Sequence, residues 1–434
     1  WVKIPMLDAA NRPVKMPADR WLDTIPESFT SPHFNRGDVT LAFDVVEGGA
    51  WSSVAVAGRS LVEPYVEVDA PPPDRSLPAA DIRIDGTTIA AIGPSGTLAR
   101  PGDQVIDAGD TLITPGLVNV HTHAATAFFR GLADDRPREF WNGYAVPGQE
   151  RFTVEDHVAS VKAACAEFLL NGVTCIADRL GNMDRIAPAI AQSGIRAIVG
   201  HSLSDNRAPA DWRTAEAVLE RFGTDPTARV SAGIAPHALD TCSDALLGEC
   251  ARRAERSGAK VFIHVAQCEP EVAAIQARGH AGALACLADT GLANSRTVAA
   301  HALYLTDAEL EAWPTYGIPI AHCPASNLKI EARTMPLARL IGRVPIGLGT
   351  DWTVTNNSMD MLAEARLAAL VGKMRADDPT VLTVRQMLRM LTIDGARVLG
   401  LDHLTGSIEV GKRADLVVFD TNQLEATPAH DMAS

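Results

Sequence analysis

The sequence predicts an α/β fold: a (β/α)8 TIM-like barrel with a small β-sandwich domain built from both chain ends. Between residues 113 and 404, short apolar segments alternate with helical segments, a pattern typical of a parallel sheet covered by helices. The apolar segments number eight, which is the number that closes such a barrel. Strand-like segments with alternating apolar residues lie on both sides of this region and predict the second domain.

The predicted elements follow in chain order. Residues 1–50, rich in Pro, Asp and Arg, are expected to form an extended N-terminal arm. Residues 51–112 and 405–434 are assigned to the β-sandwich, with strands at 53–61, 82–92 and within 406–420. Thr153-Val-Glu-Asp156 has the form of a capping box and predicts a helix start. The barrel occupies residues 113–404, with strands expected near 117–120, 173–177, 197–199, 230–234, 261–264, 298–300, 319–321 and 346–348.

Composition narrows the class of protein. The chain has 434 residues, 47% of them hydrophobic, and no apolar run of membrane-spanning length. The net charge of −14 disfavours nucleic acid as a partner, because phosphate groups would be repelled. Seven scattered cysteines without a Cys-x-x-Cys pair are typical of reduced thiols. We therefore expect a cytoplasmic protein that acts on small molecules and binds neither membranes nor nucleic acid.

The first predicted barrel strand ends in a His-x-His pair. Because side chains alternate along a strand, His121 and His123 are expected to point the same way and to offer two imidazoles to one ion. Such pairs also occur on protein surfaces without a metal. A metal site at this pair therefore requires further ligands at the ends of other strands.

Polar residues follow other predicted barrel strands at the same end. In a parallel barrel the carboxyl ends of the strands meet at one face, where active sites form. Each such residue alone suits a structural role, but their repeated placement predicts a shared site. The residues are His237, His264, His301, His322 and Asp351.

These strand-end residues belong to motifs by which the chain from residue 112 to about 419 resembles the metal-dependent amidohydrolase superfamily. The resemblance is to the branch of triazine hydrolases and adenosine-type and methylthioadenosine-type deaminases. The segments that carry it are Pro115-Gly-Leu-Val-Asn-Val-His-Thr-His123, Ala235-Pro-His237, His264-Val-Ala-Gln267, Ala300-His301, His322-Cys-Pro-Ala-Ser-Asn327, Gly347-Leu-Gly-Thr-Asp351 and Gly406-Ser-Ile-Glu-Val-Gly-Lys-Arg-Ala-Asp415.

The resemblance implies that His121, His123, His264 and Asp351 hold one divalent metal ion per subunit. Imidazoles and a carboxylate suit zinc best, with iron, cobalt and manganese as alternatives, and they leave a position for water. Binuclear relatives carry a bridging lysine or glutamate, and the absence of a lysine at residues 230–237 favours a single ion.

The resemblance also implies roles in catalysis. Asp351 would take the proton of the activated water, and His301 would hydrogen-bond the nucleophile or polarise the electrophile. His237 falls where family members contact substrate, although a structural hydrogen bond is an equally open interpretation.

Gln267 departs from the pattern of the deaminases. They carry glutamate at this position, where the acid shuttles a proton to the ring nitrogen and the leaving amine. An amide can orient a substrate or the nucleophile but cannot carry a proton. The loss favours a substrate that needs no such acid, such as a carbamate, thiocarbamate, urea or activated amide. Two alternatives stay open for this position: a deliberate change from glutamate, or replacement of the acid by nearby Glu269 or Glu271.

Aromatic residues near the ligands indicate the character of the pocket. Nucleoside-directed relatives tend to place an acid immediately before the residue matching Trp141, whereas this chain has Phe140 there, which suggests a less polar substrate. Phe128, Trp141 and Trp352 are candidate walls of such a pocket, with core packing as the alternative.

These observations predict a mononuclear metal-dependent hydrolase of the amidohydrolase superfamily. Our preferred substrate is a small, rather apolar, xenobiotic compound with a carbonyl-type carbon, from which an amine or thiol is released. One alternative is an aminohydrolase of a purine or triazine-type heterocycle, and another is a non-catalytic module with the same fold. A homo-oligomer, dimer or tetramer, is expected from the resemblance.

Overall fold

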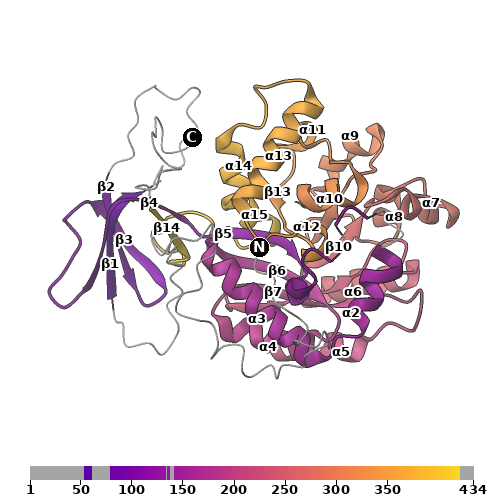
Figure 1. Ribbon diagram of the computed structural model, residues 1–434, viewed down its shortest axis with the longest axis horizontal. Coiled ribbons are helices and arrows are strands. Elements are labelled where there is room, and N and C mark those ends of the chain that lie inside the picture. The colour runs from indigo at the N-terminus through magenta and orange to yellow at the C-terminus, as the bar shows by residue number, and fades with distance from the viewer. Residues whose placement is uncertain (1–52, 61–78, 133, 137–140, 421–434) are drawn as a thin grey trace, which may run out of the picture.

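The structure is a computed structural model that describes residues 53–60, 79–132, 134–136 and 141–420. A barrel of parallel strands covered by helices forms the main body, and a smaller mixed sheet lies beside it (Figure 1). The predicted N-terminal arm, residues 1–50, lies outside the described residues. None of the helices described here combines the length and apolar character that crossing a membrane requires.

The eight predicted strands form the barrel, so this prediction is confirmed. Two parallel groups, β5-β6-β7-β8 and β10-β11-β12-β13, make up its wall, and β9 pairs with β7. Parallel bridges between Ile234 and Val261 and between Thr122 and Asp351 join the groups and close the barrel. The strands are β5 (Leu117–Thr122), β6 (Val173–Leu180), β7 (Arg196–Leu203), β8 (Val230–Ala232), β9 (Ala235–Pro236), β10 (Val261–Val265), β11 (Thr297–His301), β12 (Ile320–His322) and β13 (Ile346–Leu348).

Helices surround the strands because each crossover returns the chain to the same end of the sheet. At α3 the predicted capping box is present: the Thr153 side chain accepts from the Asp156 backbone, and the Asp156 side chain accepts in return. The helices are η2 (Ala124–Phe129), η3 (Trp141–Ala145), α2 (Val146–Glu150), α3 (Val154–Leu170), α4 (Met183–Ser193), α5 (Trp212–Phe222), α6 (Asp244–Ser257), α7 (Glu269–Ala277), α8 (Ala283–Asp289), α9 (Asp307–Tyr316), α10 (Pro324–Glu331), α11 (Leu337–Leu340), α12 (Thr353–Asn356), α13 (Met361–Ala376), α14 (Val384–Leu391) and α15 (Ile393–Leu399).

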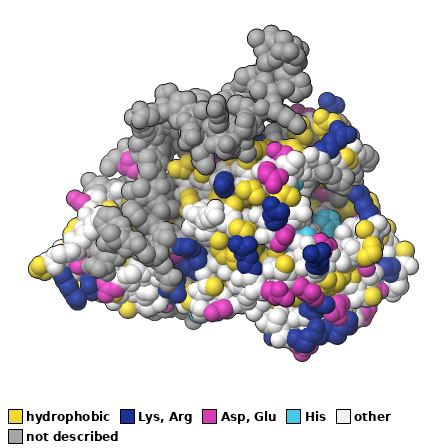
Figure 2. All heavy atoms as spheres, turned by 90° about the horizontal axis from the view of Figure 1, so that it is seen from below, with side chains coloured by type: hydrophobic (Ala, Val, Ile, Leu, Met, Phe, Trp, Pro, Cys, Tyr) yellow, Lys and Arg dark blue, Asp and Glu magenta, His cyan; other side chains and the backbone are white. Residues whose placement is uncertain are grey.

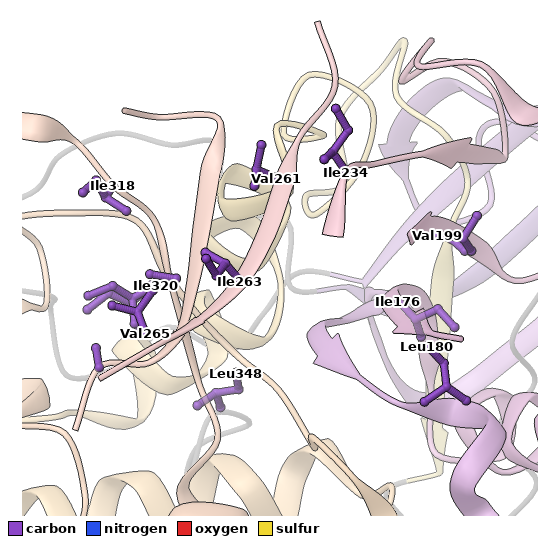
Figure 3. Packing of buried hydrophobic residues seen from close by; sticks show 14 of the residues in the cluster. Ile176, Leu180, Val199, Ile234, Val261, Ile263, Val265, Ile318, Ile320 and Leu348 are labelled. Atoms are coloured by element: carbon purple, nitrogen blue, oxygen red, sulfur yellow. The ribbon is translucent and has the colours of Figure 1, made fainter. Parts of the chain in front are cut away.

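Two apolar clusters cover the two faces of the barrel strands. The larger one lies between strands and helices and includes Ile176, Val199 and Ile263, which Figure 3 shows with their neighbours. The smaller one contains strand residues such as Val118 and Phe262 together with residues of α15. Strand residues thus alternate between the two clusters, which is why the buried strands read as nearly continuous apolar runs.

The second sheet takes strands from both ends of the described chain, as predicted. Its order is β14-β4-β1-β2-β3, and β14 pairs antiparallel with β4, Leu416 opposite Pro115. Isoleucines on one face pack with Leu416 into a separate apolar cluster. The strands are β1 (Ser53–Ser60), β2 (Ala79–Asp85), β3 (Thr88–Pro94), β4 (Gln104–Pro115) and β14 (Leu416–Asp420).

Three details of this sheet differ from the prediction. The single strand expected at 82–92 is a hairpin, because Gly86 adopts a positive φ of 61° in the turn between β2 and β3. The strand β4 was not predicted at all. Within the described residues, the strands of this smaller domain form one sheet and not two facing layers. The sandwich and the domain boundaries therefore stay predictions.

The seam between β13 and β5 depends on the absence of a side chain at Gly347. A Cβ atom there would lie 2.7 Å from Cγ1 of Val120 and 3.0 Å from Cα of Gly395. We therefore expect Gly347→Ala to lower the free energy of unfolding by about 1–3 kcal/mol. Gly181→Ala is the control, because a Cβ atom there meets nothing within 4 Å. Urea unfolding of both variants measures the difference, and equal stabilities would contradict this account of the seam.

Candidate metal centre

Four side chains from three strand ends converge at one end of the barrel. His121 and His123 come from the end of β5, His264 from β10, and Asp351 follows β13. Each offers one donor atom, and these atoms all lie within 4.8 Å of one another. Nε2 of His121 and Nε2 of His123 each lie 3.2 Å from Oδ1 of Asp351. The structure therefore brings together the four residues that the sequence singled out as metal ligands.

The hydrogen bonds of the cluster fit a bound cation. Nδ1 of His123 lies 2.7 Å from the carbonyl oxygen of Arg179, so it carries the proton and leaves the lone pair of Nε2 facing Asp351. Burial lowers the pKa of His121 to about 3, so its imidazole is neutral near pH 7. Burial opposes ionisation of Asp351, but the neighbouring histidines outweigh it and hold the pKa of Asp351 well below its usual value. A carboxylate facing an imidazole lone pair is repulsive unless a positive charge lies between them.

A shift in strand register and two positive φ angles in the backbone orient these side chains. The pairing register of β5 with β6 shifts between Asn119 and Thr122, a bulge that lets His121 face the site although Val120 also faces the barrel interior. Asp351 adopts a positive φ of 59° and His301 one of 79°. Such conformations cost roughly 1–3 kcal/mol each in non-glycine residues and are common at functional sites.

His301 lies beside the cluster at the end of β11. Its ring centroid is 5.0 Å from that of His264 and 5.5 Å from that of His121. Nδ1 of His301 lies 2.8 Å from Oδ1 of Asn327 and donates to it, so Nε2 is left as an acceptor. His301 is thus placed to accept a hydrogen bond from a nucleophile at the cluster.

Two more predicted strand-end histidines are found close by. The ring of His237 lies 5.1 Å from that of His264, and its Nδ1 lies 2.7 Å from Oγ1 of Thr241. His322, at the end of β12, is buried and its pKa is lowered to about 3 by burial and by His301. Histidine side chains are visible at the bottom of a hollow on one face of the molecule (Figure 2).

Gln267 stands three residues after His264, half-buried in the turn that follows β10. Its side-chain amide makes no hydrogen bond with the described residues, and its backbone N–H donates to Oε2 of Glu271 at 2.7 Å. Glu271 is fully buried, and its other oxygen accepts from the backbone of Ala266, so the carboxyl is turned away from a ligand at the cluster. Glu269 is exposed in the first turn of α7. We infer that neither glutamate replaces an acid at position 267.

Three residues near the cluster were missed from the sequence. Arg179 and Asp178 lie near the end of β6, just after an apolar run, and the same placement that marked His264 could have found them. Oδ1 of Asp178 accepts the backbone N–H of Ala124, and burial raises the pKa of Asp178 to about 6. Ser326 donates to Oδ2 of Asp351 at 2.5 Å, a contact between distant segments that no local pattern reveals.

The predicted aromatic walls are only partly in place. Phe128 is 49% exposed on η2, whereas the next residue, Phe129, is buried against Ala145 and Val354. Trp352 packs against that same apolar cluster beside Asp351. The side chain of Trp141 lies outside what the structure describes. Phe129 and Trp352 thus share one apolar cluster beside Asp351, and Phe128 stays a predicted wall of the pocket.

A second group of possible ligands does not suit a metal ion. It consists of Asp244, His280 and Cys286. Nη2 of Arg278 lies 3.5 Å from both Oδ1 of Asp244 and Sγ of Cys286, so a guanidinium already supplies the positive charge.

Residues 112–433 match the Amidohydrolase family. Among similar proteins, a 5-methylthioadenosine/S-adenosylhomocysteine deaminase of Desulforudis audaxviator is 36% identical over 359 residues, which cover 81% of this chain and 83% of that protein. A 5'-deoxyadenosine deaminase of Methanosarcina barkeri is 33% identical, with 84% of each chain covered. The chain therefore belongs to the amidohydrolase family and is a metal-dependent hydrolase.

Solved structures agree with this assignment. An adenosine deaminase from Xanthomonas campestris, solved with bound zinc, superposes with a TM-score of 0.79, is 31% identical and covers 88% of both chains. A triazine hydrolase from Arthrobacter aurescens gives a TM-score of 0.78 at 22% identity, covers 88% of this chain and 90% of that one, and supports the fold alone.

The metal centre predicts a simple change in metal content. Purified protein should hold about one divalent ion per chain, and His264→Ala should hold clearly less after dialysis against a weak chelator, because one of the four donors is lost. His201→Ala is the matched control. His201 is also a buried histidine near the end of a barrel strand, but its Nε2 lies 3.6 Å from Oδ2 of Asp211, the residue that caps α5. Elemental analysis measures both. Equal metal content in the two variants would refute the proposed ligand set.

Proposed function

We propose that this protein is a mononuclear metal-dependent aminohydrolase of a purine or related nitrogen heterocycle, with zinc as the ion. The supporting observation is the cluster of His121, His123, His264 and Asp351 with His301 beside it, in a chain one third identical to adenosine-type deaminases. These relatives favour the alternative in our sequence-based predictions over the preferred carbamate, thiocarbamate or urea. A xenobiotic substrate has no support from them.

Each side chain at the site has its own role in such a reaction. A bound divalent ion would lower the pKa of a water molecule towards about 7 and so supply hydroxide at neutral pH. Asp351, an anion, is placed to accept the proton of that water, and Nε2 of His301 to accept a hydrogen bond from the nucleophile. The amide of Gln267 is free to donate to an oxygen or nitrogen atom of the substrate.

A second candidate is hydrolysis of a carbonyl-type carbon, as in carbamates, thiocarbamates and ureas. One observation favours it: the deaminase acid is replaced by Gln267, and neither Glu269 nor Glu271 takes its place. A carbonyl substrate with a good leaving group needs no proton on a ring nitrogen. Apolar contacts around Phe129 and Trp352 suit an apolar substituent in either case.

Assembly and location stay predictions. A homo-oligomer and a cytoplasmic location were expected from the resemblance and the cysteine pattern, and light scattering of the purified protein would test the first.

The two candidates respond differently to Gln267→Glu. For an aminohydrolase we expect ammonia release from adenosine, 5'-deoxyadenosine or methylthioadenosine, and a rise in kcat/KM of about 10²-fold or more in Gln267→Glu, because a general acid is gained. Gln276→Glu makes the same chemical change at an exposed position of α7 and should have no effect.

A parallel panel of phenylureas, carbamates and thiocarbamates completes the test. Release of amine or thiol by the wild-type protein, with no ammonia from any heterocycle in either protein, would refute the aminohydrolase and support the second candidate. Inactivity towards both panels in protein carrying a full complement of metal would refute both.

A further inference from the structure

Arg179 places a guanidinium group among the metal ligands. It stands near the end of β6 and is 1% exposed. Nη1 donates to the carbonyl oxygen of Pro236 at 3.2 Å, and Nη2 donates to that of His237 at 3.1 Å. Nη2 also lies 2.8 Å from Nδ1 and 2.7 Å from Nε2 of His264. The residue thus ties the strand ends of β6 and β9 to a ligand on β10.

This contact uses the electron pair that a metal ion needs. A guanidinium has only donors, so the ring nitrogen of His264 that meets it must present its lone pair. A neutral imidazole has one such lone pair, so only one of the two ring nitrogens near Nη2 can accept its hydrogen. A guanidinium keeps its proton at neutral pH, so Arg179 is a cation. Arg179 and a metal ion therefore compete for His264.

We propose that Arg179 sets the metal affinity of the site: it holds the ring of His264 before metal binds, and it must release that ring when the ion arrives. The carbonyl oxygens of Pro236 and His237 keep the guanidinium nearby after the release. A like charge close to the ion weakens its binding and speeds its departure. Arg179 is a positioning residue in this account, because its Nη1 and Nη2 donors face protein atoms.

The proposal rests on the metal centre described above, and the two can be tested separately. The zinc dissociation constant of metal-stripped protein is measured by competition with a chromophoric chelator, and zinc release is followed after excess chelator is added. We expect Arg179→Met to bind zinc roughly tenfold more tightly and to release it more slowly, because the competing cation is gone. Arg179→Gln, neutral but still able to donate to the carbonyl of His237, should behave the same way.

Two further variants separate charge from structure. Arg179→Lys keeps a positive charge and should stay close to the wild-type affinity. Arg196→Met removes another buried arginine, one that pairs with Asp415 at 2.8 Å at the start of β7. It should lose stability without any change in zinc affinity. Unchanged or weaker zinc binding in folded Arg179→Met or Arg179→Gln would overturn the proposal, while a wild-type protein that binds no zinc would overturn the metal centre itself.

A measurement on the unmodified protein needs no variant. In a crystal structure of the zinc-loaded wild-type protein we expect the guanidinium of Arg179 to have left hydrogen-bonding distance of both ring nitrogens of His264. A retained bond to His264 in the loaded protein would overturn the proposal.

Discussion

The site depends on the closure of the barrel between its first and last strands. The backbone N–H of Asp351 donates to the carbonyl oxygen of His121 at 3.0 Å, and Thr122 and Asp351 form a parallel bridge. These contacts join residues about 230 positions apart in the chain, and they place a carboxylate against two imidazoles. The glycine just after β13 allows the approach, because a Cβ atom at Gly349 would lie 2.8 Å from the carbonyl oxygen of His121. Without this seam the four donors would not share one ion.

The charged side chains at the site differ from the pattern of its branch. A glutamate at position 267 would add a negative charge and a proton carrier, and Gln267 supplies neither. Arg179 adds a positive charge beside His264. The described side chains around the cluster thus hold the anion Asp351 and the cation Arg179 before any ion binds. Compared with the deaminase pattern, the site has one negative charge fewer, and this difference favours negative charge developing on the substrate.

Much of the fold and of the ligand set was predictable from sequence because both follow from short-range rules. Buried parallel strands read as apolar runs, and a polar residue just beyond each run marks the end where the site lies. That rule found His121, His264 and Asp351, and applied with equal care it would have found Arg179. The hairpin turn at Gly86 was also within reach, since Asp-Gly is a strong turn signal.

Other features have no local signal. The bond from Ser326 to Asp351, and the bulge that turns His121 into the site, arise from packing between distant segments. The exposure of Phe128 and the burial of Phe129 depend on which side of η2 meets α12. The direction of the Glu271 carboxyl, back towards Ala266 and Gln267, is likewise set by the turn after β10.

The central claim is that three imidazoles and one carboxylate hold a single ion, and X-ray absorption at the zinc edge tests it most directly. The account predicts a coordination shell of nitrogen and oxygen atoms at about 2.0–2.2 Å, with the multiple-scattering signature of three imidazole rings. Sulfur neighbours near 2.3 Å would place the ion at a cysteine instead, and a shell without imidazole would show that the histidines of the barrel do not bind it. Either result would contradict the account.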